Sequence, residues 1–414
     1  MPDEAVVAEV AGQAVVIGSR EQLLHLLAEA AEIEHTLMCS YLYAAFSLKR
    51  PGEPGISAAQ GELLDRWRKT IMDVAVEEMG HLVIVANLTV AVGGQPHFGR
   101  PNFPVATGYF PSGVAVRLTG FDAETLKHFI FLERPQGVEG EDSDAFVGDD
   151  YRREQAHLGL MPSAQDYATI GHLYEAIRAN LIALSAELGE AGLFIGDAAS
   201  QVARAVIDLD GVEPIVDLAA AQRAIDVVVE QGEGSSADSE ESHYRSFLTI
   251  QSELDAATRD DAGFAAAWSV ADSPVLRQPP EPAGKTFVDH PDAAPLLDFA
   301  CATYGLLLRC LVQCFGRGAA AEKAQGALMS AAIELMHVLG EASTALARLP
   351  AAADGDHGNA GMTFTMLRGV EPIPVRVERA ILRERVAALS GTRCNLSARA
   401  RTALEQAAGY LASY

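Results

Sequence analysis

The chain has 414 residues, and 49% of them are hydrophobic. This length is too great for one simple core and suits two packed units. Lys and Arg number 31 against 56 Asp and Glu, for a formal net charge of −25. A surface this acidic repels phosphate backbones and anionic lipid, so we expect neither a nucleic-acid nor a membrane partner.

The first residues and the cysteines favour a cytoplasmic protein. MPDEAVVAEV has neither the basic nor the apolar region of a signal peptide. No uncharged apolar run approaches the roughly 20 residues of a membrane-spanning helix, and the longest candidate, residues 306–315, is interrupted by Arg309. The five cysteines are odd in number, which indicates reduced thiols rather than a disulfide framework.

The first half of the chain predicts a helical hairpin. Residues 1–18 favour a short β segment, because AVVAEVAGQAVVI is rich in β-branched residues around Gly12. Ser19, with Gln22 three residues later, has the pattern of a capping box and opens a helix to about Lys49. A second helix spans about 58–92. Two matched helices of about 30 residues joined by a short turn are typical of a helix bundle.

The remaining elements complete the bundle and extend it. Residues 95–160 predict a long crossover with short β-like pieces and one short helix at 121–131. A third helix follows at about 166–188, and a fourth begins at 219–231, is interrupted by GEGSSADSEE and resumes at HYRSFLTIQSELDAA. We therefore expect a mainly all-α protein: a four-helix bundle over 19–260, a linker at 261–285, and a C-terminal helical region at 286–414. Helices are expected there at 291–315, 319–348 and about 376–410.

The bundle helices carry the inventory of a dinuclear metal site. Such a site takes one Glu from each of two helices and a Glu-x-x-His pair from each of the other two. Carboxylates bridge two cations, and imidazole adds affinity for iron, manganese or zinc. The candidate ligands in chain order are Glu34, Glu78, His81, Glu175, Glu230 and His243.

Each candidate also has a structural alternative. A lone Glu-x-x-His is usually a solvated pair, but the apolar flanks in DVAVEEMGHLVIVANL leave little room for a wet face around Glu78 and His81. A carboxylate buried there is costly unless it is paired or bound to metal. Glu34 could be exposed beside His35, or Glu175 could pair with Arg178.

Helix four departs from the simple pattern. Glu230 and His243 are thirteen residues apart, so about ten residues must loop out to restore a spacing of three. Glu233 and Glu240 remain open as alternatives for the helix-four carboxylate.

Three tyrosines belong to the same predicted region. Tyr41, Tyr43 and Tyr174 are each compatible with a core position and a satisfied hydroxyl. We nominate Tyr41 as a catalytic proton or radical relay. The C-terminal Glu334-x-x-His337 repeats the ligand spacing without matching partners, and we interpret it as structural.

Several strings together resemble a known family. IEHTLMCSYLYAAFSLK, VEEMGHLVIVANLTVAVGGQP, FLERPQ, IGHLYEAI and SHYRSF are similar to the ferritin-like domain of iminophenyl-pyruvate dimer synthases and chromopyrrolate synthases. The resemblance covers about 19–260 and implies a ferritin-like four-helix bundle with the six candidate ligands at metal positions. The dimer synthases are much longer chains, so their reaction does not transfer directly.

The ligand inventory and the resemblance together lead to a functional expectation. We expect a metal-dependent oxidase or oxygenase, with two iron ions or alternatively manganese, that uses dioxygen or peroxide. Its substrate would be a small amino-acid-derived molecule in natural-product biosynthesis, and oxidative coupling of imines is a close variant. Manganese catalase-like peroxide disproportionation, iron storage, and a structural relic with salt-bridged ligands are the alternatives. A homodimer is possible.

Overall fold

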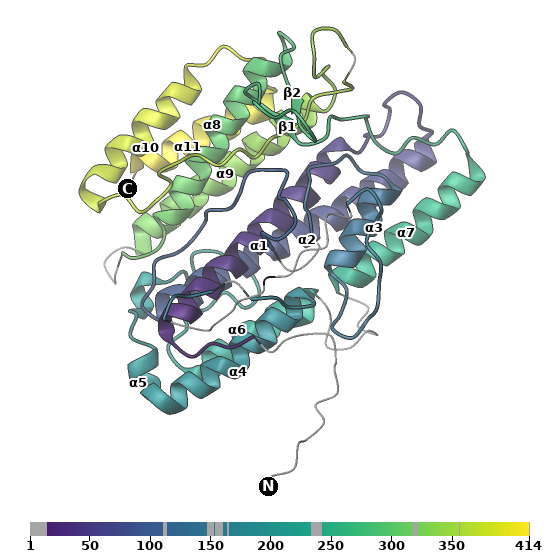
Figure 1. The fold of residues 1–414 in the computed structure, drawn as a ribbon. Coiled ribbons are helices and arrows are strands. Elements are labelled where there is room, and N and C mark those ends of the chain that lie inside the picture. Colours follow the sequence, from purple (N-terminus) through teal and green to yellow (C-terminus); the bar gives the residue numbers. More distant parts are fainter. Residues whose placement is uncertain are drawn as a thin grey trace.

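The structure is a computed structural model that describes residues 15–110, 114–146, 153, 160–163, 165–232, 242–317, 322–355 and 357–413. The described residues are mainly helical, as expected (Figure 1). Strands β1 (Pro274–Val275) and β2 (Thr286–Phe287) form a short parallel pair. Most of the predicted β segment at 1–18 lies outside the described residues, and 15–17 form no strand.

Two long helices run side by side through the centre of the molecule (Figure 1). The first, α1 (Arg20–Ser47), begins where the Ser19 side chain accepts a hydrogen bond from the Gln22 amide. The second, α2 (Ala58–Ala91), begins with a complete capping box between Ser57 and Gln60. Both helices are buried along most of their length, because other helices cover the pair on two sides.

Four shorter helices, called the broken helices below, cover one side of this pair. Helix α3 (Ala123–Leu132) packs against α7 (His243–Asp260), and α4 (Ile170–Leu188) packs against α6 (Leu218–Gly232). The C-terminal end of α3, the N-terminal end of α4 and the C-terminal end of α6 line one small cavity, so these helix ends lie at the same level of the bundle. The short helices α5 (Glu190–Leu193) and η1 (Ala198–Ser200) lie in the connection between α4 and α6.

The C-terminal helices form a layer on the other side of α1 and α2 (Figure 1). Helix α8 (Ala293–Val312) packs on α9 (Glu322–Leu346), and α9 also packs on α1 and on α11 (Ala398–Ser413). The single helix predicted at 376–410 is wrong, since α10 (Val375–Ser390) ends at Gly391 before α11 begins. The predicted start of helix three at residue 166 is also four residues early, because Thr169 caps α4.

Two helices are long and apolar enough to cross a membrane by length and composition, contrary to our expectation from the sequence. These are α2 and α8, with mean hydropathies of 1.4 and 1.5, and the bent pair 170–188 and 190–200 passes only if counted as one span. In α2 and α8, 83% and 78% of the apolar window is buried inside the protein. Their apolar character therefore matches their position within the fold.

Candidate metal centre

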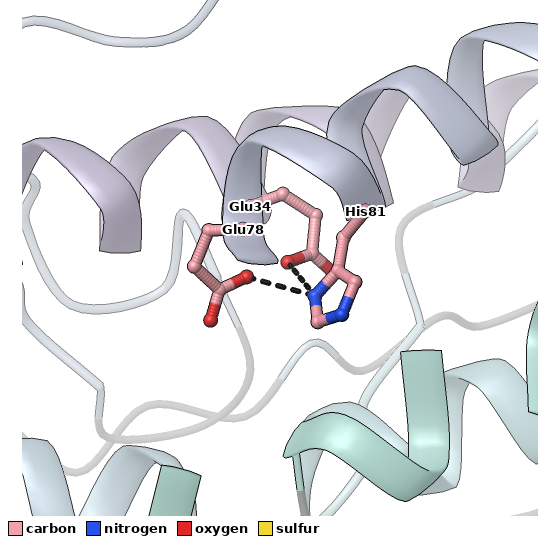
Figure 2. A group of neighbouring side chains, drawn as sticks. All are labelled: Glu34, Glu78 and His81. Carbon is pink, nitrogen blue, oxygen red and sulfur yellow. Dashed lines mark hydrogen bonds and ion pairs between the residues drawn. The ribbon is translucent and has the colours of Figure 1, made fainter. Parts of the chain in front are cut away.

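A buried group of three side chains joins the two long helices (Figure 2). Helix α1 supplies Glu34, and α2 supplies Glu78 and His81 one turn apart on the same face. His81 Nδ1 lies 3.0 Å from Glu78 Oε2 and 3.5 Å from Glu34 Oε2. All three side chains are 2% exposed, so water cannot offset the charge that they carry.

A second group shares Glu78 with the first. Glu133, the residue that ends α3, and His243, the first residue of α7, complete it. His243 Nδ1 lies 3.1 Å from Glu78 Oε1 and 3.5 Å from Glu133 Oε2. The two oxygens of Glu78 therefore face two different histidines, which is the arrangement of a carboxylate that bridges two ions.

The outer nitrogen of each histidine is held by a second residue. His81 Nε2 lies 2.9 Å from Gln231 Oε1, and His243 Nε2 lies 2.7 Å from Glu77 Oε2. Because both partners are acceptors, an N–H on Nε2 leaves the Nδ1 lone pair of each ring aimed at the carboxylates. Outer partners orient metal-binding histidines in this way. Nδ1 of His243 is buried, and although it lies close to Glu78 and Glu133 it makes no contact of hydrogen-bond geometry with any described residue.

Two tyrosines complete the surroundings in a nearly symmetric manner. Tyr174 of α4 donates to Glu34 Oε1 at 2.5 Å, and Tyr41 of α1 donates to Glu133 Oε1. The Tyr41 ring is fixed edge-on against Phe129 and Phe247. Each outer carboxylate thus has one tyrosine donor, whereas the shared carboxylate of Glu78 faces the two histidines.

Burial and mutual repulsion shift the acid–base properties of the cluster. Burial, with the charge of Glu78 beside it, raises the pKa of Glu34 to about 8. Burial alone would lower the pKa of His81, but Glu78 and Glu34 together raise it to about 10. Burial would likewise raise the pKa of Glu78, yet His81 and His243 hold it well below its usual range. The cluster therefore favours bound positive charge.

The residues present fit two divalent cations. Once bound ions displace the protons of the cluster, its three carboxylates carry a formal charge of −3, which two divalent cations would more than offset, and Nδ1 of His243 points into the group. Oxygen and imidazole donors without thiolate suit iron, manganese or zinc. The cavity that the described residues form beside the cluster has a volume of about 20 Å³, which is room for a water-sized molecule.

Two predicted ligands do not reach the cluster. The Glu175 side chain is 43% exposed and lies 3.5 Å from Arg178, which also pairs with Asp226 of α6 at 2.6 Å. Glu230 is exposed on α6. In both cases a neighbouring residue faces inward instead: Tyr174 contacts Glu34, and Gln231 contacts His81. The alternatives Glu233 and Glu240 lie outside the described residues.

Glu133 was not anticipated as a ligand. It lies in the predicted crossover, within FLERPQ, directly after the apolar helix LKHFIFL. A buried carboxylate at the C-terminal end of a helix meets the negative end of the helix dipole and is unfavourable without a neighbouring cation. A glutamate directly after an apolar helix was therefore the feature of the sequence that could have indicated Glu133. The prediction that Tyr43 lies in the same region as Tyr41 and Tyr174 is wrong, since its hydroxyl donates to the Ala271 carbonyl away from the cluster.

Long paired helices, broken facing helices and a shared buried carboxylate define a bundle protein of the ferritin class. The chain belongs to the Ferritin-like family, whose profile matches residues 27–252. A ferritin-like protein from Caulobacter vibrioides, known from a crystal structure, shares the fold with a TM-score of 0.50 at 17% identity. The match covers 85% of this chain and 100% of that one.

Two enzymes are similar to the chain in sequence. Dichlorochromopyrrolate synthase from Lentzea aerocolonigenes is 28% identical over 84% of this chain and 36% of its own length. The 2-imino-3-(indol-3-yl)propanoate dimerase of Chromobacterium violaceum is 27% identical over 82% of this chain and 33% of its own length. The chain thus spans about a third of the length of each relative.

Proposed function

We propose that the chain is a non-haem oxidoreductase that holds two metal ions in its bundle, iron in the first instance. The observation that carries the proposal is the shared buried carboxylate: Glu78 presents one oxygen to each of two histidines, and each half has its own outer glutamate. His81 with Glu34 would hold one ion, and His243 with Glu133 the other. A dinuclear iron centre supplies redox chemistry with dioxygen or peroxide.

The chain's own residues would position and shield this chemistry. Tyr174 and Tyr41 would orient the outer carboxylates, and Gln231 and Glu77 would hold the histidine rings. Tyr41 reaches the cluster through its hydroxyl and stays our candidate for a proton or electron relay. The small cavity admits an oxidant of the size of dioxygen and excludes bulk water.

The substrate class follows from the relatives. One is named as a synthase of a dichlorinated chromopyrrolate and the other as a dimerase of an indolyl imine. We propose that this chain acts on a small amino-acid-derived imine in natural-product biosynthesis, with oxidative coupling as the reaction.

Peroxide disproportionation by manganese is the second candidate, because the same carboxylate and imidazole ligands suit manganese. Iron storage is a third, and the native mass separates it from the enzymes: a large cage favours storage, whereas a monomer or homodimer does not.

The first experiment is elemental analysis of protein purified without a metal-affinity tag. We expect about two equivalents of iron per chain, lost in Glu78→Gln and kept in Glu175→Gln, whose side chain is 43% exposed and away from the cluster. Oxygen consumption with 3-aryl-2-iminopropanoates then tests the reaction. Manganese in place of iron would favour the peroxide reaction, and no stoichiometric metal after anaerobic loading would overturn the proposal.

A further inference from the structure

A second cavity lies between the α1–α2 pair and the C-terminal helices α8 and α9. Its volume is about 370 Å³, and all four helices contribute to its wall. The lining is almost entirely apolar and is rich in methionine. Representative wall residues are Met38, Met79, Val83, Leu307, Met329 and Met336.

This cavity faces away from the metal centre. Successive residues of a helix point about 100° apart, so neighbours of the metal-binding residues face the opposite layer. Met79 follows Glu78, and His35 follows Glu34; both line this cavity. The two sites therefore share α1 and α2 as a common wall but open to different sides.

A hydrogen-bonded pair forms the polar end of the cavity. His35 Nδ1 lies 3.0 Å from the Phe98 carbonyl, which can only accept, so Nδ1 carries the proton. His35 Nε2 then accepts from the Tyr304 hydroxyl at 2.5 Å. Arg100 Nη2 lies 3.3 Å from the same hydroxyl oxygen, which serves as an acceptor. The Tyr304 oxygen, which also lies 3.7 Å from Cys39 Sγ, is thus an oriented acceptor at one end of the cavity, and His337 is a further polar side chain in the mostly apolar lining.

We propose that this cavity binds a neutral aromatic molecule of one or two fused rings that carries a hydroxyl or N–H group. The volume lies at the lower end of the roughly 300–1,000 Å³ range of ligand sites. Methionine side chains adapt their shape and make favourable contacts with aromatic rings. No carboxylate, lysine or arginine lines the cavity among the described residues. The guanidinium of Arg100, behind Tyr304, already donates to the Tyr304 hydroxyl and to the Pro101 and Phe364 carbonyls, so a charged ligand would lose hydration without a direct counter-charge. The inference does not depend on the metal chemistry.

Naphthalene and 2-naphthol are suitable probes, since they differ only in the hydroxyl group. We expect saturable binding of both to the full chain, measured by calorimetry at neutral pH. Met336→Trp narrows the cavity and should weaken both affinities at least tenfold, and Met72→Trp provides an independent second variant from the facing wall. Met161→Trp is the matched control, because Met161 is 82% exposed and outside the cavity.

The polar end is tested with Tyr304→Phe. This variant should lower the 2-naphthol affinity about fivefold, the effect of one hydrogen bond, and leave naphthalene binding unchanged. Circular dichroism and thermal melts establish that each variant is folded. Glu78→Gln should retain binding of both probes, because it belongs to the other face. The proposal is overturned if wild type shows no saturable binding, if both tryptophan variants bind as wild type does, if Tyr304→Phe weakens both probes equally, or if Glu78→Gln abolishes binding.

Discussion

Two interpretations of the cluster around Glu78 make different demands on its histidines: a metal centre, as proposed above, and a set of buried salt bridges. A salt-bridged cluster needs protonated rings, whereas a metal centre needs the Nδ1 lone pairs of His81 and His243. The Nε2 atoms of both rings face acceptors, which leaves Nδ1 directed at the carboxylates. The two interpretations therefore differ in how metal affinity responds to pH.

The affinity of the cluster for metal should depend on pH. The pKa of Glu34 is raised to about 8 and that of His81 to about 10, so both groups bind protons at neutral pH. A metal ion must displace at least one of these protons, so its apparent affinity should increase about tenfold per pH unit between pH 6 and 8. Calorimetric titration with Mn²⁺ in buffers of different protonation enthalpy measures both affinity and proton release. An affinity independent of pH would contradict the assignment.

Tyr41 provides a second prediction. Its hydroxyl donates to Glu133, and Phe129 and Phe247 fix the ring, so Tyr41→Phe removes one hydrogen bond with little change in packing. We expect about a tenfold loss of turnover or of affinity for the ion held by Glu133 and His243, as for other partners of metal ligands. Tyr43→Phe is the control, because its hydroxyl donates to the Ala271 carbonyl instead. Equal turnover and affinity in the two variants would assign Tyr41 to packing alone.

Two residues of the cluster, Glu133 and His243, lie at the ends of helices rather than along their faces. Glu133 ends α3 and His243 begins α7, while Glu34 and Glu78 come from the middle of long helices. A residue at a helix end depends on the cap for its orientation, because no preceding turn holds it. The position of His243 should therefore depend on its N-cap, Ser242.

Ser242→Ala tests this dependence. The Ser242 side chain accepts from the Arg245 amide at 3.4 Å, and losing such a cap costs about 1 kcal/mol. We expect a similar loss of stability and, in addition, about tenfold weaker binding of one of the two ions. Ser57→Ala removes the equivalent cap of α2, at 3.3 Å from the Gln60 amide and far from the cluster, and should cost stability alone. Unchanged affinity of both ions in Ser242→Ala would show that packing alone places His243.

The helices of the bundle were predictable from the sequence to different degrees. The hairpin of α1 and α2 was predictable, because caps and prolines mark its ends and both helices are apolar over many turns. Glu34, Glu78 and His81 lie in those continuous helices, and the structure brings them together. Glu175 and Glu230 lie in short helices next to breaks, where an error of one residue rotates a side chain by about 100°. Tyr174 and Gln231 occupy the inward positions there.

Helices α8 and α9 were predicted at nearly their observed bounds, whereas the position of Glu133 and the packing of the C-terminal layer were beyond such rules. The crossover that carries Glu133 has no long periodic pattern, so its docking against α7 depends on tertiary contacts. The apolar character of α8 likewise arises from burial against α9 and α10, which a local window cannot distinguish from a membrane span. The helix pattern and the resemblance both predicted the bundle, and three-dimensional packing determines which side chains face the cluster.

At the scale of the whole molecule, one helical hairpin is the wall of two sites. The broken helices cover the face with the metal centre, and the C-terminal helices cover the face with the apolar cavity. Because α1 and α2 are buried on both sides, a change in either site is transmitted to the stability of the same core. Metal binding should therefore stabilise the chain globally.

The corresponding prediction is a metal-dependent melting temperature. An ion that binds only the folded chain stabilises it by about 2.7 kcal/mol at a hundredfold excess over Kd, equivalent to a rise of about 3 °C in the melting temperature of a chain of this length. We expect this rise on anaerobic addition of Fe²⁺ and its reversal by a chelator, measured by scanning calorimetry. Glu78→Gln should melt at the same temperature with and without metal, because it removes the negative charge and replaces one of the two oxygens that would bridge the ions. Glu175→Gln should respond as wild type does, since its side chain pairs with Arg178 on the surface. A rise of equal size in Glu78→Gln would place the stabilising ion outside the cluster and contradict the assignment.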